Sequence, residues 1–583
     1  MAQNTGGRII AQALEEEGVD TIFGIIDGSY LHLFATCVDM GMKLVTPRHE
    51  TTAMHMAGAY ARLTGRLGVA IASNGPGVAN VLSGVAVENA EGNRVLLITS
   101  SRRTGITYPD RGGAYQCFDQ VGVIGPMAKW SASASSFERI PEMVRKALRA
   151  CYEGRPGVVH LDVPEDLMNG DCDDFPTWEK HQYRSLGPIM PSDDEVAAAA
   201  DILAAARLPI IHAGSGVIHA GAFRELEELA DILHSPVSTS WSARGVLPET
   251  HELAWPMVYI DACNALRNGA DAVLCLGSRL GETDWWGKPP NWAPPSAQKL
   301  IQVDIDPSAL GRNRPADLLV RSDIRAFLVR LIENLKSKTG SMPIQVRHEG
   351  VSELAESRDA ERMNLDAALS DTESPMLTAH VGAVCREVLD DDAVVVFDGG
   401  NTAVWANAYW RIRTPNTQLG TWHMGHLGAG PGQALGAAVA RPDAQVCCII
   451  GDGAMGFHPQ EIETAVRNGL KVIFVVCSDK QWGMVKTTEI FAFGMVGDRF
   501  PNALSEAPHI NGDLGEILWD DLARSMGAHG ERVADPAELG PALKRCIEAD
   551  TCSVIHVDVD PTKHMFAPGL MHFKQMHQEP AGE

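Results

Sequence analysis

Two acidic residues, each placed directly after an apolar segment, constrain the fold of this chain more than any other feature. Asp452 lies in Gly451-Asp452-Gly453, after the apolar run 445–450, and Asp479 follows the apolar run 472–476. Each run is short enough for a buried strand, and residues 459–468 between them are typical of a helix with a proline near its start. Two parallel strands joined by a helix place both carboxylates at one edge of a sheet, where open α/β sheets bind ligands.

The chemistry around these acids favours a phosphate group bound through a metal ion. Gly451 and Gly453 permit a tight turn and expose backbone N–H groups at a helix start, which attracts an anion. Carboxylate oxygens suit Mg²⁺, which proteins commonly hold with one or two carboxylates together with substrate phosphates. The segment therefore predicts a metal-bridged diphosphate.

Gly-Asp-Gly, then a helix, a strand and a second polar pair, resembles the cofactor fingerprint of thiamine diphosphate (ThDP) enzymes. The resemblance implies that Asp452, Asp479 and the backbone carbonyl of Gln481 hold Mg²⁺. The family usually has Asn where this chain has Asp479, so the carboxylate adds a negative charge beside the diphosphate. The resemblance also implies cofactor contacts for a set of residues in this half of the chain: Asn401, Thr402, Gly425, Leu427, Asp452, Gly453, Ala454, Asp479, Gln481, Trp482, Gly483 and Met484.

Some of these residues have a specific role in the family that the chain resembles. The residue at the position of Leu427 holds the cofactor in a bent conformation, and the carbonyl at the position of Gly425 accepts a hydrogen bond from its amino group. Asn401 and Thr402 would flank the diphosphate, or would only cap the following helix. His423 and His426 lie in the same segment and either face the substrate or are structural.

The size and composition of the chain suit a multidomain enzyme. Its 583 residues predict three to four domains, and 45% hydrophobic with 21% charged residues is typical of globular proteins. A net charge of −25 argues against binding to nucleic acid or to an anionic membrane. No apolar run reaches the roughly 18 residues of a membrane span, and the polar N-terminus does not indicate a signal peptide. Because the twelve cysteines form no Cys-x-x-Cys pair, buried reduced thiols and a cytoplasmic protein are expected.

Strands that alternate with helices predict three consecutive α/β domains with mainly parallel sheets. We expect an acidic, proline-rich linker at 168–192, a second linker with a surface helix at 337–371, and a mobile loop at 491–513. The tail either closes over the site or is a frayed end. The predicted ranges are an N-terminal pyrimidine-binding domain at 1–190, a central Rossmann-like domain at 193–338, a diphosphate-binding domain at 372–560 and the tail at 561–583.

Glu50 is the main catalytic candidate of the N-terminal part. A glutamate before a helix is often only a partner of the helix dipole. Here Arg48-His49-Glu50, a helix and then Gly75-Pro76-Gly77-x-x-Asn80 resemble the pyrimidine-binding domain of acetohydroxyacid synthases and benzaldehyde lyase. Glu50 is expected to stand at a strand end, where a catalytic acid could sit. The resemblance implies that Glu50 hydrogen-bonds the aminopyrimidine ring and so activates the cofactor, and that Pro76 and Asn80 also contact the cofactor.

A second group of candidates lies in the loop 113–121. Gln116 matches the active-site glutamine of acetohydroxyacid synthases, whereas Gly-x-Tyr-x-x-x-Asp-Gln, which contains Tyr115, resembles oxalyl-CoA decarboxylase. Both side chains could donate a hydrogen bond to a substrate oxygen that gains negative charge, or both are ordinary loop residues. The backbone N–H of Gly28 could act in the same way, and Ser29 stands where benzaldehyde lyase has a histidine.

The central domain has a weak nucleotide signal, Gly214-x-Gly216 after an apolar segment. In the family that the chain resembles, this domain binds FAD, ADP or no cofactor. A purely structural domain is therefore the alternative to a nucleotide site. The candidate contacts for an adenine nucleotide or a CoA tail are Arg279, Trp285, Trp286, Trp292, Arg312, Asn313, Arg314 and Pro315.

These observations predict a ThDP- and Mg²⁺-dependent lyase, decarboxylase or carboligase for 2-keto acids, acyloins or aldehydes. One alternative is an acyl-CoA enzyme similar to oxalyl-CoA decarboxylase or 2-hydroxyacyl-CoA lyase. Another is an inactive regulatory relative, against which the presence of Glu50, Asp452 and Asp479 argues. In relatives the domains that carry Glu50 and Asp452 meet across a subunit interface, so a homodimer or homotetramer is expected.

Overall fold

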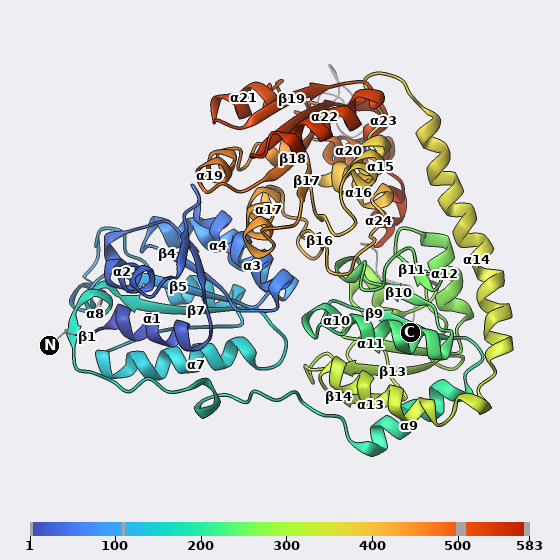
Figure 1. Ribbon diagram of the computed structural model, residues 1–583, viewed down its shortest axis with the longest axis horizontal. Coiled ribbons are helices and arrows are strands. Elements are labelled where there is room, and N and C mark those ends of the chain that lie inside the picture. The colour runs from blue at the N-terminus through green and yellow to red at the C-terminus, as the bar shows by residue number, and fades with distance from the viewer. Residues whose placement is uncertain (1–3, 108–110, 497–508, 577–583) are drawn as a thin grey trace.

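The computed structural model describes residues 4–107, 111–496 and 509–576. Figure 1 shows three α/β units, with the N-terminal unit on the left, the central unit at the lower right and the third unit at the top. In the described residues each unit contains a six-stranded sheet in which all paired strands are parallel. The predicted fold class is therefore confirmed.

The N-terminal sheet has the strand order β3-β2-β4-β5-β7-β6. Its inner strands are continuous apolar runs, because helices cover both faces of a parallel sheet. A short antiparallel pair joins β1 (Asn4–Thr5) to β8 (Asp171–Cys172). The other elements are α1 (Gly6–Glu16), β2 (Thr21–Gly24), η1 (Gly28–Tyr30), α2 (Leu31–Asp39), β3 (Lys43–Val45), α3 (Glu50–Thr64), β4 (Gly68–Ala72), α4 (Pro76–Glu91), β5 (Val95–Ser101), α5 (Thr104–Thr107), α6 (Gln120–Ile124), β6 (Trp130–Ser133), α7 (Ile140–Tyr152), β7 (Val158–Pro164) and α8 (Glu165–Asn169).

The central sheet has the order β11-β10-β9-β12-β13-β14. A capping box of Ser192 and Glu195 starts its first helix, since each side chain pairs with the backbone N–H of the other residue. Its elements are α9 (Asp193–Ala205), β9 (Pro209–Ala213), α10 (Gly216–His219), α11 (Phe223–Leu233), β10 (Val237–Thr239), η5 (Trp241–Ala243), β11 (Ala254–Trp255), α12 (Ile260–Gly269), β12 (Ala272–Leu276), η6 (Glu282–Gly287), β13 (Lys299–Asp304), β14 (Leu318–Arg321) and α13 (Ile324–Lys336).

The third sheet has the order β16-β15-β17-β18-β20-β19. Four cysteines predicted to be buried in strands of the central and third sheets, Cys275, Cys447, Cys448 and Cys477, are buried there. The elements of this unit are α15 (Ala379–Val388), β15 (Val394–Asp398), α16 (Gly400–Tyr409), β16 (Gln418–Leu419), α17 (Ala429–Ala440), β17 (Val446–Gly451), α18 (Asp452–Met455), α19 (Glu461–Arg467), β18 (Val472–Ser478), α20 (Gly483–Val496), α21 (Trp519–Ser525), β19 (His529–Val533), α22 (Pro536–Glu548) and β20 (Ser553–Asp558).

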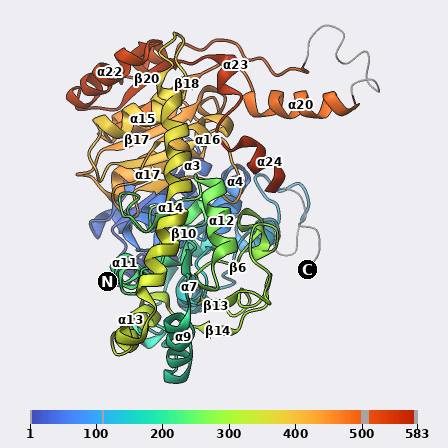
Figure 2. The same ribbon diagram turned by 90° about the vertical axis from the view of Figure 1, so that its right-hand side faces the viewer.

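The central and third units are joined by the helix α14 (Ile344–Ala367), which Figure 2 shows running along the side of the molecule. Its residues are mostly polar and exposed, as the sequence predicted for a surface helix in a linker. After the last strand, the tail forms α23 (Pro561–His564) and α24 (Leu570–Met576). The tail is packed against the protein up to Met576, whose exposed fraction is only 2%, so a frayed end is wrong for this stretch.

The N-terminal and third units contact each other through α3 and α17. Two glycines of α17 allow this approach. A Cβ atom at Gly432 would lie 2.7 Å from the Cβ of His55, and one at Gly436 would lie 2.4 Å from the carbonyl oxygen of Met56. The helix that begins with Glu50 is therefore fixed directly to the third unit of the same chain.

Two local expectations need correction. Glu50 is the first residue of α3, five residues beyond the end of β3, and does not stand at a strand end. Residues 491–496, expected to be part of a loop, continue α20, which projects from the body in Figure 2. Residues 497–508 of the same expected loop lie outside the described residues. Among the helices that the structure describes, none has the length and apolar character needed to cross a bilayer.

Candidate active site

A cavity of about 500 Å³ lies beside the carboxyl ends of β15, β17 and β18 in the third unit. Its wall combines the start of α16, residues 421–427 and the two loops that carry the acids. It contains every residue of this unit that the fingerprint associated with the cofactor: Asn401, Thr402, Gly425, Leu427, Asp452, Gly453, Ala454, Asp479, Gln481, Trp482, Gly483 and Met484.

The two acids lie where the sequence placed them, after neighbouring parallel strands. Asp452 accepts hydrogen bonds from the backbone N–H groups of Gly453 (2.7 Å) and Lys480 (2.8 Å) and from the Ser478 hydroxyl (3.1 Å). Asp479 accepts one from the Gln481 side-chain amide at 3.1 Å. Burial, and then the negative charge of Asp452, raise the pKa of Asp479 to about 7. Two buried carboxylates side by side repel each other, and a bound divalent cation would remove this repulsion.

The donor set fits Mg²⁺ bridged to a diphosphate. Two carboxylates and a backbone carbonyl are ligands of the kind that Mg²⁺ prefers. In the part of the chain that the structure describes, no group of three or more His, Cys, Asp or Glu residues could hold a metal ion. A metal at Asp452 and Asp479 therefore needs further oxygen ligands, such as those of phosphate groups.

The cavity wall also has polar groups that lack a partner in the chain. Asn401 is 3% exposed, and neither its amide nitrogen nor its amide oxygen has a hydrogen-bond partner among the described residues. It lies in the first turn of α16 and does not cap the helix, since the capping residue is Gly399. Buried polar groups are almost always paired. An unpaired amide beside the N-terminus of a helix fits a bound phosphate group.

Glu50 and the turn before α4 form a second cluster in the N-terminal unit. Glu50 is 9% exposed, and its Oε2 accepts a hydrogen bond from Asn80 at 3.0 Å. A Cβ atom at Gly77 would come within 3.5 Å of Oε1 of Glu50, so the turn lies against the carboxylate. Pro76 occupies the first turn of α4 next to Gly77. The structure thus brings Glu50, Pro76 and Asn80 together.

Gln116 and Ser29 lie on the other side of the same turn. The Gln116 carbonyl accepts a hydrogen bond from the Asn74 side chain at 3.3 Å. The backbone φ of Gln116 is 54°, a left-handed value that is uncommon outside glycine. Ser29 lies next to Gly28 in η1, and its hydroxyl oxygen is 2.5 Å from that of Ser100. The Ser100 hydroxyl also accepts a hydrogen bond from the backbone N–H of Asn74. Tyr115 is 75% exposed.

The two clusters are separate within one chain. The cavity wall of the third unit includes none of the N-terminal candidates Gly28, Ser29, Glu50, Pro76, Asn80, Tyr115 and Gln116. The two histidines of the cavity segment contact the N-terminal unit instead. His423 Nδ1 lies 3.0 Å from Glu91 Oε2, and the ring of His426 lies 5.6 Å from that of His55.

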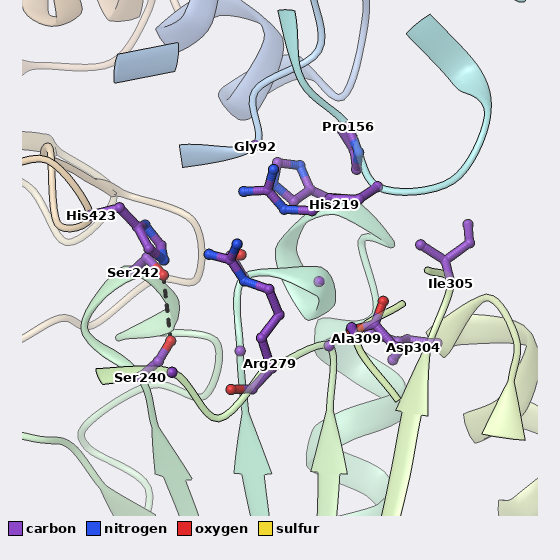
Figure 3. A pocket seen from close by; sticks show the side chains of 18 of the residues that line it. Gly92, Pro156, His219, Ser240, Ser242, Arg279, Asp304, Ile305, Ala309 and His423 are labelled. Carbon is purple, nitrogen blue, oxygen red and sulfur yellow. Dashed lines mark hydrogen bonds between the residues drawn. The ribbon is translucent and has the colours of Figure 1, made fainter. Parts of the chain in front are cut away.

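A second cavity, of about 460 Å³, lies between the N-terminal and central units. Figure 3 shows the strands of the central sheet ending at it, with Arg279 reaching across it and His423 at one side. Four arginines line it, Arg94, Arg155, Arg279 and Arg312. Burial, and then the neighbouring Arg279, lower the pKa of Arg155 to about 10.

The predicted nucleotide contacts are only partly gathered at this cavity. Arg279, Trp286, Arg312 and Asn313 line it. Trp285 instead donates a hydrogen bond to His572 of the tail, Trp292 is buried and donates to the Asp284 carbonyl, and Arg314 donates to the Gly287 carbonyl. Gly214 and Gly216 also line the cavity, and close packing requires both glycines, since a Cβ atom at either would lie within 2.7 Å of Gly277.

Sequence reasoning missed several residues of the first cavity. Glu282 and Thr283 of η6, together with His423, line both cavities and so form a shared wall. His564 and Met576 of the tail also line the first cavity. No spacing in the sequence relates these residues to the acids, because they come from a different unit or from beyond the last strand.

Three family models match the chain in order. They are described as the N-terminal TPP binding domain (residues 4–123), the central domain (196–331) and the C-terminal TPP binding domain (398–557) of thiamine pyrophosphate enzymes. The chain is 31% identical over 563 residues to an acetolactate synthase large subunit of Mycobacterium tuberculosis, covering 95% of this chain and 96% of that protein. It is 28% identical over 579 residues to a probable acetolactate synthase large subunit of Methanococcus aeolicus, covering 97% and 94%. It is 27% identical over 578 residues to the acetolactate synthase isozyme 3 large subunit of Escherichia coli, covering 97% and 96%. This chain therefore belongs to the thiamine pyrophosphate enzyme family and is a ThDP-dependent enzyme.

Proposed function

We propose that the protein is a ThDP- and Mg²⁺-dependent carboligase of the acetolactate synthase type, acting on 2-keto acids, acyloins or aldehydes. The observation that carries the proposal is the cavity in which every predicted diphosphate and metal residue of the third unit meets. The names of its relatives, acetolactate synthases over nearly the whole chain, support the same reaction class.

When bound, ThDP supplies the nucleophilic carbon that adds to a substrate carbonyl and stabilises the resulting negative charge. Glu50 would hold the pyrimidine ring through a hydrogen bond, with its carboxylate kept in place by Asn80. Gln116 and the backbone N–H of Gly28 would donate hydrogen bonds to the substrate oxygen. Tyr115 and Ser29 would line the substrate side, and Leu427 and the Gly425 carbonyl would hold the ring system.

Asp452, Asp479 and the Gln481 carbonyl would hold the Mg²⁺. The backbone N–H groups that bind Asp452 fix one carboxylate, and the Gln481 amide fixes the other. Asn401, Thr402, Gly453 and Ala454 would face the diphosphate, and Trp482, Gly483 and Met484 close that side of the cavity.

A complete site needs a second copy of the chain. Glu50 does not line the cavity of its own chain, and both half-sites have exposed apolar side chains beside them. Ile26 (55%) and Tyr115 (75%) are exposed on the N-terminal unit, and Met424 (51%) and Val485 (50%) on the third unit. Exposed apolar side chains of this kind mark interaction surfaces. The proposal is a homodimer, or a tetramer of two dimers, with two sites per dimer.

The second cavity favours a bound nucleotide or a CoA tail. Its arginines would pair with phosphate groups, and Asp304, at the carboxyl end of β13, would accept ribose hydroxyl groups. This observation keeps an acyl-CoA substrate as the second candidate function. Competition between CoA and the acyl acceptor would favour that candidate, whereas a copurifying FAD or ADP would favour a resident nucleotide.

The proposed function is tested with the purified protein, ThDP and Mg²⁺. We expect rapid deuterium exchange at the reactive carbon of ThDP, and a slowing of more than about 100-fold in Glu50→Gln at unchanged ThDP binding. A screen of 2-keto acids, aldehydes and acyl-CoA compounds, read by mass spectrometry, identifies the product. Tight ThDP binding by the wild type without carbon exchange would contradict an active enzyme and favour a regulatory relative.

The intersubunit site has its own test. Glu50→Gln and Asp452→Ala protein should each be inactive. If each site takes Glu50 from one chain and Asp452 from the other, a mixed dimer places both lesions in one site and leaves the second intact. Activity should therefore return when the two variants are refolded together. If activity does not return although mass spectrometry shows that mixed dimers have formed, then one chain holds the whole site.

A further inference from the structure

His564, the last residue of α23, is a buried histidine of the cofactor cavity that has no role in the site described so far. Its exposed fraction is 3%, and it lines the cavity together with the two acids. It lies in the tail, beyond residue 557, where the match to the C-terminal domain of the family ends. Its position near the diphosphate side of the cavity raises the question of what its ring binds.

One edge of the ring is fixed by the protein. His564 Nδ1 lies 2.6 Å from the Thr378 hydroxyl, and the His564 carbonyl accepts a hydrogen bond from Trp405 at 2.8 Å. In the described residues the Thr378 side chain has no other hydrogen-bond partner. We therefore assign the hydroxyl as donor to Nδ1, which leaves the ring proton on Nε2.

The other edge of the ring points to a gap between two residues of the cofactor site. Nε2 makes a long hydrogen bond of 3.3 Å with Thr402 Oγ1 and lies 3.9 Å from Asp479 Oδ2. The second distance is too long for a hydrogen bond. The unpaired amide of Asn401 borders the same gap, because a Cβ atom at Gly483 would lie 2.9 Å from Asn401 Nδ2 and 3.1 Å from Asp479 Oδ2.

The tail is held against the metal loop, so the ring cannot move independently of it. The Gln481 side chain donates a hydrogen bond to the Pro561 carbonyl at 2.6 Å. Thr487, at the start of α20, donates one to the Met565 carbonyl at 3.2 Å. Hydrogen bonds on both sides of His564 therefore connect it to the segment that carries Asp479.

We propose that His564 is a diphosphate-binding residue, whose Nε2–H donates a hydrogen bond to a diphosphate oxygen of ThDP. The inference rests on the proposed ThDP site.

The proposal is tested by the affinity of the full-length protein for ThDP and for thiamine, which lacks the diphosphate. Binding at saturating Mg²⁺ is followed by quenching of tryptophan fluorescence, since Trp482 lines the cavity. We expect His564→Leu to weaken ThDP binding about 10- to 100-fold and to change thiamine binding less than about twofold. His564→Gln, which returns an N–H at similar reach, should recover most of the affinity.

The matched control is His572→Leu in α24, a tail histidine that contacts Trp285 and does not line the cavity. It should leave the affinity for ThDP unchanged. An unchanged ThDP affinity in His564→Leu, or an equal loss for ThDP and thiamine, would overturn the proposal. If His564→Leu does not fold, His564→Gln is compared with the shorter His564→Asn, and equal ThDP affinities would also overturn it. A wild type that binds no ThDP would instead overturn the proposed function.

Discussion

The side-chain oxygen of Gln120 accepts a hydrogen bond from the backbone N–H of Gly75 at 2.9 Å. Gly75 lies in the turn before α4, the helix that contains Asn80, and Asn80 donates a hydrogen bond to Glu50. The Gln120 amide nitrogen donates to the Ser100 carbonyl at 2.8 Å and to the buried Asp162 carboxylate at 3.0 Å. Gly75 has a φ of 65°, a left-handed value that glycine adopts without steric cost. Gln120 thus connects the turn beside Glu50 to the core of the N-terminal sheet.

Replacing Gln120 by leucine is expected to lower the free energy of unfolding by about 2–3 kcal/mol. The change leaves the Gly75 N–H and one hydrogen-bond position of Asp162 unsatisfied in a buried place. Chemical denaturation of the cofactor-free protein measures the loss. Gln182→Leu is the control, since that side chain is exposed and should change stability by less than about 0.5 kcal/mol. Equal effects of both variants would show that the buried bonds of Gln120 contribute little.

Asn401→Leu is expected to separate stability from cofactor binding. The amide is buried with no partner among the residues that the structure describes, so an apolar residue of similar volume should raise the free energy of unfolding of the cofactor-free protein by about 1–2 kcal/mol. The same change should weaken ThDP binding about tenfold, because the phosphate loses a donor. Denaturation without cofactor and a ThDP titration check the two effects. A cofactor-free protein that becomes less stable would mean that the amide has a partner of its own.

Asp479→Asn is expected to keep ThDP and Mg²⁺ binding within about threefold of the wild type, since the amide oxygen remains a metal ligand. Asp452→Asn should weaken binding more than about tenfold, because Asp452 is the carboxylate that the backbone fixes. Titration of each variant with ThDP and Mg²⁺ measures both. Loss of all binding in Asp479→Asn would assign that carboxylate a role beyond metal coordination.

The buried pair of His55 and Glu88 predicts a pH range of greatest stability. The two side chains lie 2.7 Å apart. Burial raises the pKa of Glu88 from 4.5 to about 8 and lowers that of His55 from 6.5 to about 3. Because the pKa of Glu88 is higher in the folded than in the unfolded protein, its contribution to the free energy of unfolding falls as pH rises from about 4.5 to about 8. Because the pKa of His55 is lower in the folded than in the unfolded protein, its contribution to the free energy of unfolding falls as pH decreases below about 6.5.

The two effects oppose each other between pH 4.5 and 6.5, and above this range only the loss due to Glu88 continues. We expect Glu88→Gln, which keeps a hydrogen-bonding side chain without the charge, to gain stability relative to the wild type on going from pH 6 to pH 8. Urea denaturation of both proteins at the two pH values gives the difference. A constant difference between them would contradict the raised pKa of Glu88.

Strands and the acids that follow them could be predicted from the sequence, because buried parallel strands are continuous apolar runs. Asp452 and Asp479 therefore lie where their strands place them. Pro76 and Asn80 could be placed beside Glu50 only through a resemblance. His564 and Glu282 could not be placed at all, since long-range packing of the tail and of η6 brings them to the cavity. The end of α20 could not be predicted either, because the Gly, Pro and Asn residues of 491–513 indicate a loop, whereas the helix continues to Val496.

The contact between α3 and α17 has a consequence for the proposed dimer. Within one chain, α3 starts with Glu50, and α17 starts directly after the segment that contains Leu427. If each site combines Glu50 of one chain with Leu427 of the other, the start of α3 and the start of α17 belong to different sites. The glycines that let the helices touch then join two reaction centres by direct backbone contact. A movement of Glu50 when one site closes would therefore shift the start of α17 at the cofactor of the other site. Such a coupling would let the two sites react in turn.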